Sequence, residues 1–109
     1  MGQFEVVIGG TDKARYAPGK EIQVTADVRN LTQQKADDIL LETKVYHLDQ
    51  EIYSDRQGLA LEPEENKSIS LNWQPPDTDY QGYLICLRLT DNKGNEIARD
   101  TVGVDVSSD

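Results

Sequence analysis

The chain has 109 residues, of which 37% are hydrophobic and 28% are charged, and this is typical of one compact domain. Acidic residues number 20 against 11 basic ones, giving a formal net charge of −9. That balance argues against nucleic acid and anionic membranes as partners, because both attract basic surfaces. No segment approaches the roughly 18 apolar residues of a membrane-spanning helix, so we expect no membrane insertion. A lone cysteine, Cys86, excludes a disulfide within the chain.

Apolar and polar residues alternate along the chain with the period of two that indicates half-buried strands. The segments that alternate most clearly are residues 3–8, 22–28, 39–48, 68–73, 83–89 and 98–106. Several residues in 39–48 favour a helix, but the β-branched Thr43 and Val45 favour a strand. Ile52 and Tyr53 are expected to mark only a short edge strand.

Turn and loop signals separate these segments. Gly9-Gly10 is expected to end the first strand, and the sequence Tyr-Ala-Pro-Gly at 16–19 predicts a turn. Residues 30–38 and the acidic stretch 59–67 are expected to be loops, and residues 91–95 a hairpin turn. Together these features predict an all-β fold, an immunoglobulin-like antiparallel β-sandwich of about seven strands, with residues 1–109 as a single domain.

The inward positions of the strands predict the core. We expect Trp73 in particular to be buried between the sheets, because it ends its strand on the inward register. The residues expected to be largely buried are Val24, Val28, Leu41, Val45, Leu71, Trp73, Ile85, Leu87 and Val104.

The sequence offers few residues for catalysis. His47 is the only histidine, and no acid and nucleophile in the sequence point to a triad with it. Cys86 lies in a strand between Ile85 and Leu87, where a cysteine usually acts as a small packing residue. We therefore expect no catalytic residue in this chain.

Metal and cofactor sites are not expected either. Cysteine and histidine are too few for a structural zinc site. Residues 91–96 resemble a calcium loop only faintly, because Lys93 occupies the third position and no acid stands at the twelfth. The acidic pairs Asp37-Asp38 and Glu64-Glu65 fall in predicted loops, without the fixed separation across a cleft that glycosidase carboxylates need.

The tyrosines provide the alternative of a sugar-binding surface. Tyr46, Tyr53 and Tyr80 are the candidate glycan contacts, since exposed aromatic rings would be the main requirement of such a surface. Several of the chain's aromatic residues are expected in the core, so we expect any affinity for isomaltooligosaccharides to be weaker than about millimolar.

Several motifs together resemble a known family. The opening sequence Thr-Asp-Lys-Ala-Arg-Tyr-Ala-Pro-Gly at 11–19 is followed by His-Leu-Asp at 47–49, Trp-Gln-Pro-Pro at 73–76 and Asp-Tyr-Gln-Gly-Tyr-Leu at 79–84. The end, residues 104–109, resembles a junction into a catalytic barrel. In this order the motifs resemble the N-terminal immunoglobulin-like domain of family 66 glycoside hydrolases, the dextranases and cycloisomaltooligosaccharide glucanotransferases.

The resemblance implies a bacterial, secreted parent enzyme acting on α-1,6-linked glucan, although residues 1–4 carry no signal-peptide pattern. It also implies that the catalytic acids belong to a (β/α)8 barrel outside this chain, so the barrel of the same polypeptide is the expected partner. Two function classes follow. The chain is a structural accessory domain of such an enzyme, or it is an independent module that binds carbohydrate or protein.

Overall fold

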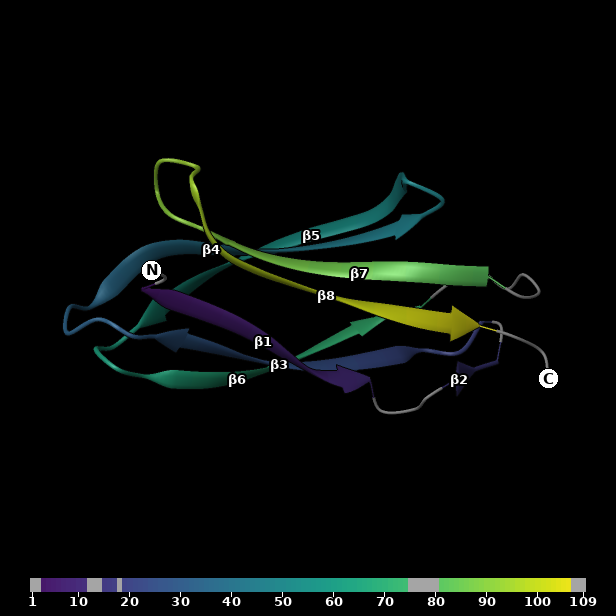
Figure 1. The fold of residues 1–109 in the computed structure, drawn as a ribbon, viewed down its shortest axis with the longest axis horizontal. Helices are drawn as coiled ribbons and strands as arrows, with labels where there is room; N and C mark the ends of the chain where they lie inside the picture. Colours follow the sequence, from purple (N-terminus) through teal and green to yellow (C-terminus); the bar gives the residue numbers. More distant parts are fainter. Residues whose placement is uncertain (1–2, 12–14, 18, 75–80, 107–109) are drawn as a thin grey trace.

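A computed structural model describes residues 3–11, 15–17, 19–74 and 81–106 of the chain. These residues form strands stacked in two layers, with no helix among them (Figure 1). The strands are β1 (Phe4–Thr11), β2 (Arg15–Tyr16), β3 (Ile22–Asn30), β4 (Ala36–His47), β5 (Gln50–Leu61), β6 (Asn66–Trp73), β7 (Gln81–Thr90) and β8 (Glu96–Val106). The described segments therefore contain no helix that could span a bilayer.

The two layers are a three-stranded sheet in the order β1-β3-β6 and a five-stranded sheet in the order β2-β8-β7-β4-β5. The long strands pair antiparallel, whereas the two-residue β2 pairs parallel with the end of β8. The prediction of an immunoglobulin-like antiparallel β-sandwich of about seven strands is confirmed, and β2 is a short addition to it.

The core lies between the sheets in two clusters. One cluster includes Trp73 and Tyr83, and the other includes Leu41 and Leu87. Every predicted core residue is buried except Leu71, which is only partly buried. Leu71 faces inward as predicted and packs against both core clusters, but it lies on the edge strand β6 and lines a hollow there.

The edge strand β5 is longer than the sequence predicts. It has 12 residues in place of the expected pair Ile52 and Tyr53, and only residues 62–65 separate it from β6. The prediction of a loop over residues 59–67 was therefore wrong. The alternation is weak in β5 because an edge strand buries few of its side chains, so its sequence carries little of the pattern that identifies a strand.

Two other boundaries differ from the predictions. Gly9-Gly10 does not end β1, because the strand continues to Thr11 through a β-bulge between Ile8 and Gly10. Glycine tolerates the φ of 129° at Gly10, so the pair bends the strand without ending it. The predicted loop over 30–38 is also shorter than expected, since β4 already begins at Ala36.

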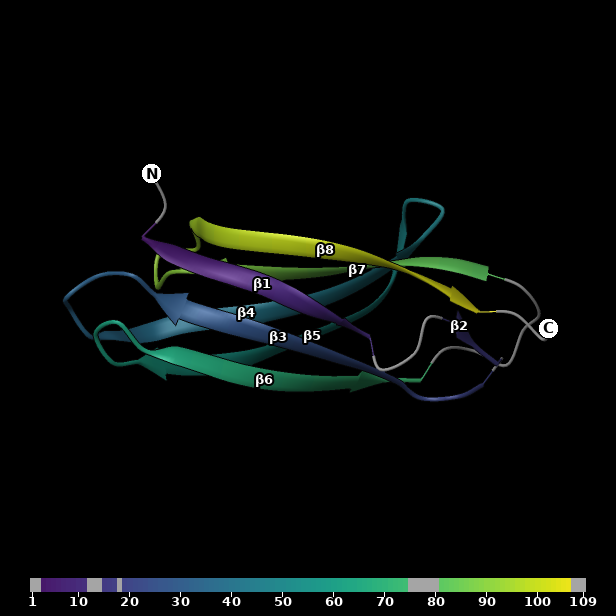
Figure 2. The ribbon, with the colours of Figure 1, turned by 60° about the horizontal axis from the view of Figure 1, so that its bottom comes forward.

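The sandwich is closed on one side and open on the other. β1 and β8 run along one side, and β6 and β5 along the other (Figure 2). On the closed side the Ile8 backbone N–H donates to Asp100 Oδ2 across 2.8 Å, which ties β1 to β8. On the open side β6 pairs only with β3, and β5 only with β4, among the described strands.

Candidate functional site

The tyrosines that the sequence singles out do not share a face. Tyr46 lies on the outer face of the five-stranded sheet, beside Lys44 and Cys86. Tyr53 lies on the inner face of β5 and packs against the core cluster that contains Trp73. Tyr80 lies outside the described residues. A flat platform that includes both Tyr46 and Tyr53 is therefore not formed.

His47 is the last residue of β4, at the strand end where the sequence places it. Its Nδ1 lies 3.0 Å from the carbonyl oxygen of Gly82, and its ring lies 5.5 Å from the Tyr83 ring. No carboxylate or nucleophilic hydroxyl is bonded to the imidazole among the described residues. These contacts link β4 to β7 and leave His47 without the partners that acid–base catalysis requires.

Cys86 lies on the outer face of β7 and is half-buried. Desolvation by burial raises the pKa of its thiol, and the positive charge of Arg99 opposes this effect only in part. Because the thiolate is the nucleophilic form, the environment of Cys86 disfavours covalent catalysis.

Several of the acidic residues are surface groups with local partners. Asp37 pairs with Lys35 at 3.4 Å, and Glu65 Oε1 accepts from the backbone N–H of Glu62 at 2.8 Å. Asp91 Oδ1 accepts from the backbone N–H groups of Lys93 and Asn95, both at 2.9 Å, which confirms the hairpin turn. Within the described ranges, no group of three or more His, Cys, Asp and Glu side chains could hold a metal ion.

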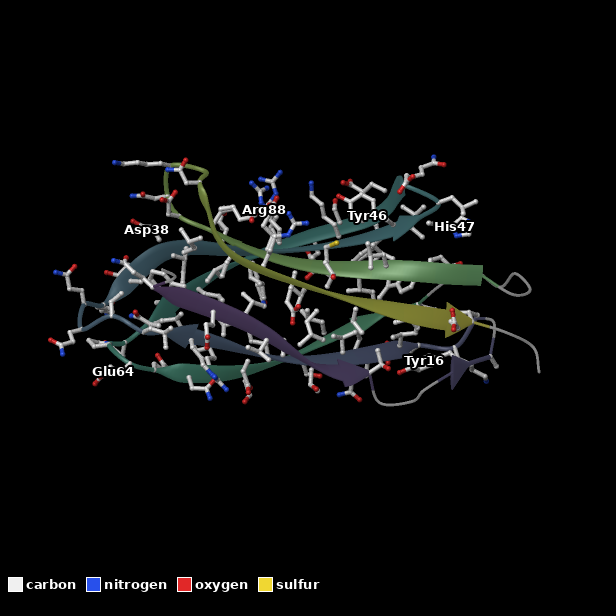
Figure 3. All side chains as sticks on the ribbon, viewed as in Figure 1. Tyr16, Asp38, Tyr46, His47, Glu64 and Arg88 are labelled. Carbon is white, nitrogen blue, oxygen red and sulfur yellow. The ribbon has the colours of Figure 1, made fainter. Side chains whose placement is uncertain are left out.

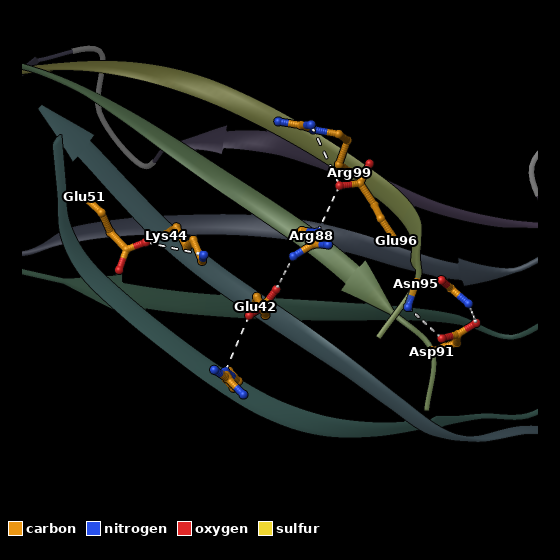
Figure 4. A network of polar contacts seen from close by, with 9 residues as sticks. Glu42, Lys44, Glu51, Arg88, Asp91, Asn95, Glu96 and Arg99 are labelled. Atoms are coloured by element: carbon orange, nitrogen blue, oxygen red, sulfur yellow. Dashed lines mark hydrogen bonds and ion pairs between the residues drawn. The ribbon is translucent and has the colours of Figure 1, made fainter. Parts of the chain in front are cut away.

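A ladder of ion pairs crosses the outer face of the five-stranded sheet (Figure 4). Glu42 lies at its centre, with Arg88 at 3.0 Å and Arg56 at 3.5 Å, and its side chain is only 13% exposed. Arg88 also pairs with Glu96 at 3.0 Å. Each carboxylate of the ladder is thus held by a guanidinium. The ladder links neighbouring strands across the outer face of the sheet.

One end of the sandwich, which we call the exit end, contains β2, the last residue of β8 and the β4–β5 turn; Figure 3 labels Tyr16 and His47 there. Val106 is fully buried and pairs with Gln81 of β7 and Tyr16 of β2. Leu48 lies at the tip of the turn and is 85% exposed. Both Leu48 and Asp49 have positive φ, 51° and 66°, a conformation that costs energy in residues with side chains.

The family model of glycosyl hydrolase family 66 matches residues 11–109. The chain belongs to glycosyl hydrolase family 66. Its curated relatives include a cycloisomaltooligosaccharide glucanotransferase of Niallia circulans, 27% identical over 99 residues. That match covers 91% of this chain and 10% of the relative. The family 66 chain described here therefore spans about a tenth of the length of such relatives.

Solved structures place this family 66 domain among known folds. It is similar to part of a cycloisomaltooligosaccharide glucanotransferase of Paenibacillus sp. in complex with cycloisomaltoheptaose, with a TM-score of 0.80 and 26% identity. The match covers 97% of this chain and 15% of that one. The fold is also that of a CARDB domain of Pyrococcus furiosus, with a TM-score of 0.71 and 18% identity over 98% of this chain and 96% of that one.

The sequence correctly located the hairpin turn at residues 91–95. It did not identify the exit end, because the contacts of Val106 with β2 and β7 depend on strand order.

Proposed function

We propose that residues 1–109 form one non-catalytic accessory domain of a longer family 66 enzyme, and that this domain docks through its exit end on the catalytic barrel of the same polypeptide. The parent enzyme acts on α-1,6-linked glucan, by hydrolysis or by transfer. The domain supplies stability to the barrel and takes no part in the chemical step.

The observation that carries this proposal is the way the chain reaches Val106. This residue is fully buried and is paired on both sides, so the backbone is held rigidly to the last residue of β8. The exit end is therefore a firmly held part of the sandwich, and a fixed surface of this kind suits a docked partner.

Leu48 supports the exit end as the docking surface. Leu48 has two energetic costs: its apolar side chain is exposed to water, and its backbone has a left-handed conformation. Strain of this kind often accompanies a functional contact. A partner that covers Leu48 would remove the first cost, and contacts between domains typically bury about 600–1,500 Å².

The choice of substrate class rests on the relatives, which are named cycloisomaltooligosaccharide glucanotransferases. An enzyme that acts on a polymeric glucan meets it outside the cell, so the proposal includes a secreted parent. The absence of a catalytic constellation among the described residues supports a domain without its own activity.

The test is Leu48→Lys in the long enzyme that carries this domain. A buried lysine at the interface lacks a partner, so the melting temperature of the long enzyme should fall by several degrees. In residues 1–109 alone the same substitution lies in solvent and should change the free energy of unfolding by less than about 0.5 kcal/mol.

Leu31→Lys is the matched control, because Leu31 is also exposed and lies beyond the last residue of β3, away from the exit end. It should leave the long enzyme unchanged. Docking through the exit end would be contradicted if the two substitutions lowered the melting temperature of the long enzyme equally, or if neither lowered it.

The alternative is an independent module that binds carbohydrate or protein. One observation favours it: the same fold makes up nearly the whole of a separate CARDB domain structure, so this unit does not need a neighbouring barrel to exist. A long enzyme that keeps its melting temperature after loss of the domain would favour this alternative.

A further inference from the structure

The open side of the sandwich contains a hollow of about 260 Å³ between β5 and β6. Tyr53 and Asp55 line it from the inner face of β5, and Leu71 and Trp73 line it from β6. Figure 2 shows these two edge strands on the side away from β1 and β8. The hollow is smaller than the roughly 300–1,000 Å³ of pockets for drug-sized ligands, so it suits one small ring.

Two aromatic rings give the hollow an apolar wall. The rings of Tyr53 and Trp73 lie 6.3 Å apart and are tilted by 45°. Trp73 in turn contacts Tyr83 edge-to-face at 5.0 Å, which fixes its orientation. Trp73 is therefore a rigid surface of the hollow, and the half-buried Tyr53 stands at its mouth.

The same hollow contains polar groups without partners. The Thr43 hydroxyl and the Trp73 indole N–H belong to residues that are only 7% and 9% exposed. Neither group has a hydrogen-bond partner among the described residues. Among those residues, every side-chain polar atom that is shielded from solvent does have a partner. Both groups must therefore be in contact with solvent, and both residues line the hollow.

Asp55 adds a carboxylate to this set. It pairs in register with Thr43 across β4 and β5, so the two side chains are neighbours on the inner face. The Asp55 carboxylate forms no ion pair or hydrogen bond with any described residue. An inward charge on an edge strand can simply discourage aggregation, but that role does not require an aromatic wall or unpaired donors beside it.

We propose that this hollow binds a single hexopyranose ring of an oligosaccharide. The apolar face of the sugar packs on Trp73 and Tyr53, and a sugar hydroxyl donates to the Asp55 carboxylate. Other sugar oxygens accept from the Trp73 N–H and the Thr43 hydroxyl. The ring thus satisfies each group that the protein leaves unpaired.

A small organic cation is the main rival ligand, because aromatic rings beside a carboxylate also attract cations. A cation would pair with Asp55 but would offer no acceptor to the Trp73 N–H or to Thr43. The mixed donors and acceptors of a sugar fit the hollow better. With one ring bound, we expect a dissociation constant in the millimolar range.

Trp73 is the only tryptophan of the chain and lines the hollow, so its fluorescence should respond to a ligand bound there. Residues 1–109 should be titrated with isomaltotriose, maltotriose and choline. The choice of isomaltotriose, which is α-1,6-linked, rests on the proposed function. Recognition of a sugar ring does not rest on it. Maltotriose, which has a different linkage, distinguishes recognition of the linkage from recognition of the ring. Saturation with isomaltotriose or with both sugars supports the proposal, because either result shows recognition of the ring.

The variants are Thr43→Val, which keeps the side-chain shape, and Asp55→Ala, which alters an exposed residue. Each should weaken sugar binding by about fivefold or more, as expected for loss of one hydrogen bond. Asp38→Ala, an exposed acid outside the hollow, and Tyr46→Ala, on the outer sheet face, are the controls and should bind as the unaltered chain does. Urea unfolding of each variant checks its fold, and Asp55→Ala suffices if Thr43→Val does not fold.

Three results would overturn the proposal. The first is the absence of saturation with either sugar up to about 50 mM, well above the millimolar range expected. The second is saturation with choline alone. The third is sugar binding that Tyr46→Ala abolishes while Asp55→Ala retains it. None of these results bears on docking through the exit end, which Leu48→Lys tests separately.

Discussion

Trp73 connects the two parts of the molecule that we assign to function. Its indole contacts Tyr53 on the open side and Tyr83 toward the exit end, and Tyr83 in turn contacts His47. This row of rings packs the core between edge strand β5 and the end of β4. A change at Trp73 therefore affects packing across the sandwich as well as the hollow.

Trp73→Ala should lower the free energy of unfolding by about 3–5 kcal/mol, the usual cost of truncating a large buried aromatic residue. Small domains hold only about 5–15 kcal/mol in total, so much of the population could unfold. Urea denaturation followed by circular dichroism measures the change, because the variant has no tryptophan to report it. A midpoint equal to that of the unaltered chain would mean that Trp73 contributes nothing to the core.

Asp91 makes stability depend on pH in the acid range. The backbone N–H of Asn95 is the largest of the influences that hold the pKa of this carboxyl below its ordinary value of 3.8; hydrogen bonds from Lys93 and Asn95 add to it, and partial desolvation opposes them. The folded state thus favours the carboxylate. Its contribution is present above the pKa of the unfolded chain and is lost as the pH falls through the lower pKa of the folded chain.

Asp91→Asn keeps an oxygen acceptor for the same N–H groups but does not titrate. We expect the unaltered chain to be the more stable of the two at about pH 6, and the difference to shrink as the pH falls below about 4. Urea midpoints of both proteins across this range measure the effect. A difference that stays constant with pH would assign the acid sensitivity to other carboxyls.

At the scale of strands, the hydrogen bond that ties β1 to β8 comes from one side chain, that of Asp100. Asp100 accepts the Ile8 N–H next to the bulge, where β1 has no strand partner on that side. Asp100→Ala should cost about 1–3 kcal/mol, because it leaves a partly buried donor without an acceptor. It should also speed amide hydrogen exchange at Ile8.

Asp105→Ala is the control for this change. Asp105 is an exposed acid on the same strand, and its carboxylate has no hydrogen bond with a described residue. Its removal should leave both the stability and the Ile8 exchange rate unchanged. Equal exchange rates in the two variants would show that Asp100 does not hold β1.

The strands that could be predicted from the sequence are those with one fully buried face. In β3 the inward residues Ile22, Val24, Ala26 and Val28 are buried while their neighbours are polar, so the alternation is clear. In β5 the inward face contains Tyr53, Asp55 and Gln57 along the open side, and the pattern disappears. Alternation reports burial, and it fails where an edge strand buries little.

The hollow was beyond sequence reasoning for a related reason. Thr43 and Asp55 are adjacent only through the register of β4 against β5, and both meet Trp73 only through the stacking of the two sheets. The sequence predicts which residues face inward, but it does not determine these cross-strand and cross-sheet neighbours. The family resemblance, in contrast, depends on contiguous motifs and was accessible from the start.

As a whole, the molecule is an elongated sandwich of 48 × 23 × 22 Å with the exit end at one pole of its long axis (Figure 1). Docking through this pole leaves the long sides of the sandwich exposed to solvent. The sugar-binding hollow on the open side and the docking surface at the pole can therefore be occupied together. Such a domain would stabilise its parent enzyme and contact glucan weakly at the same time.

The most direct test of docking is calorimetry of the long enzyme with and without residues 1–106, combined with its turnover number on dextran per folded molecule. We predict that removal lowers the melting temperature or the soluble yield, because apolar surface on the barrel becomes exposed. The turnover number of the molecules that remain folded should stay nearly the same. An unchanged melting temperature together with weaker substrate binding would contradict docking, and would assign the domain a purely substrate-binding role.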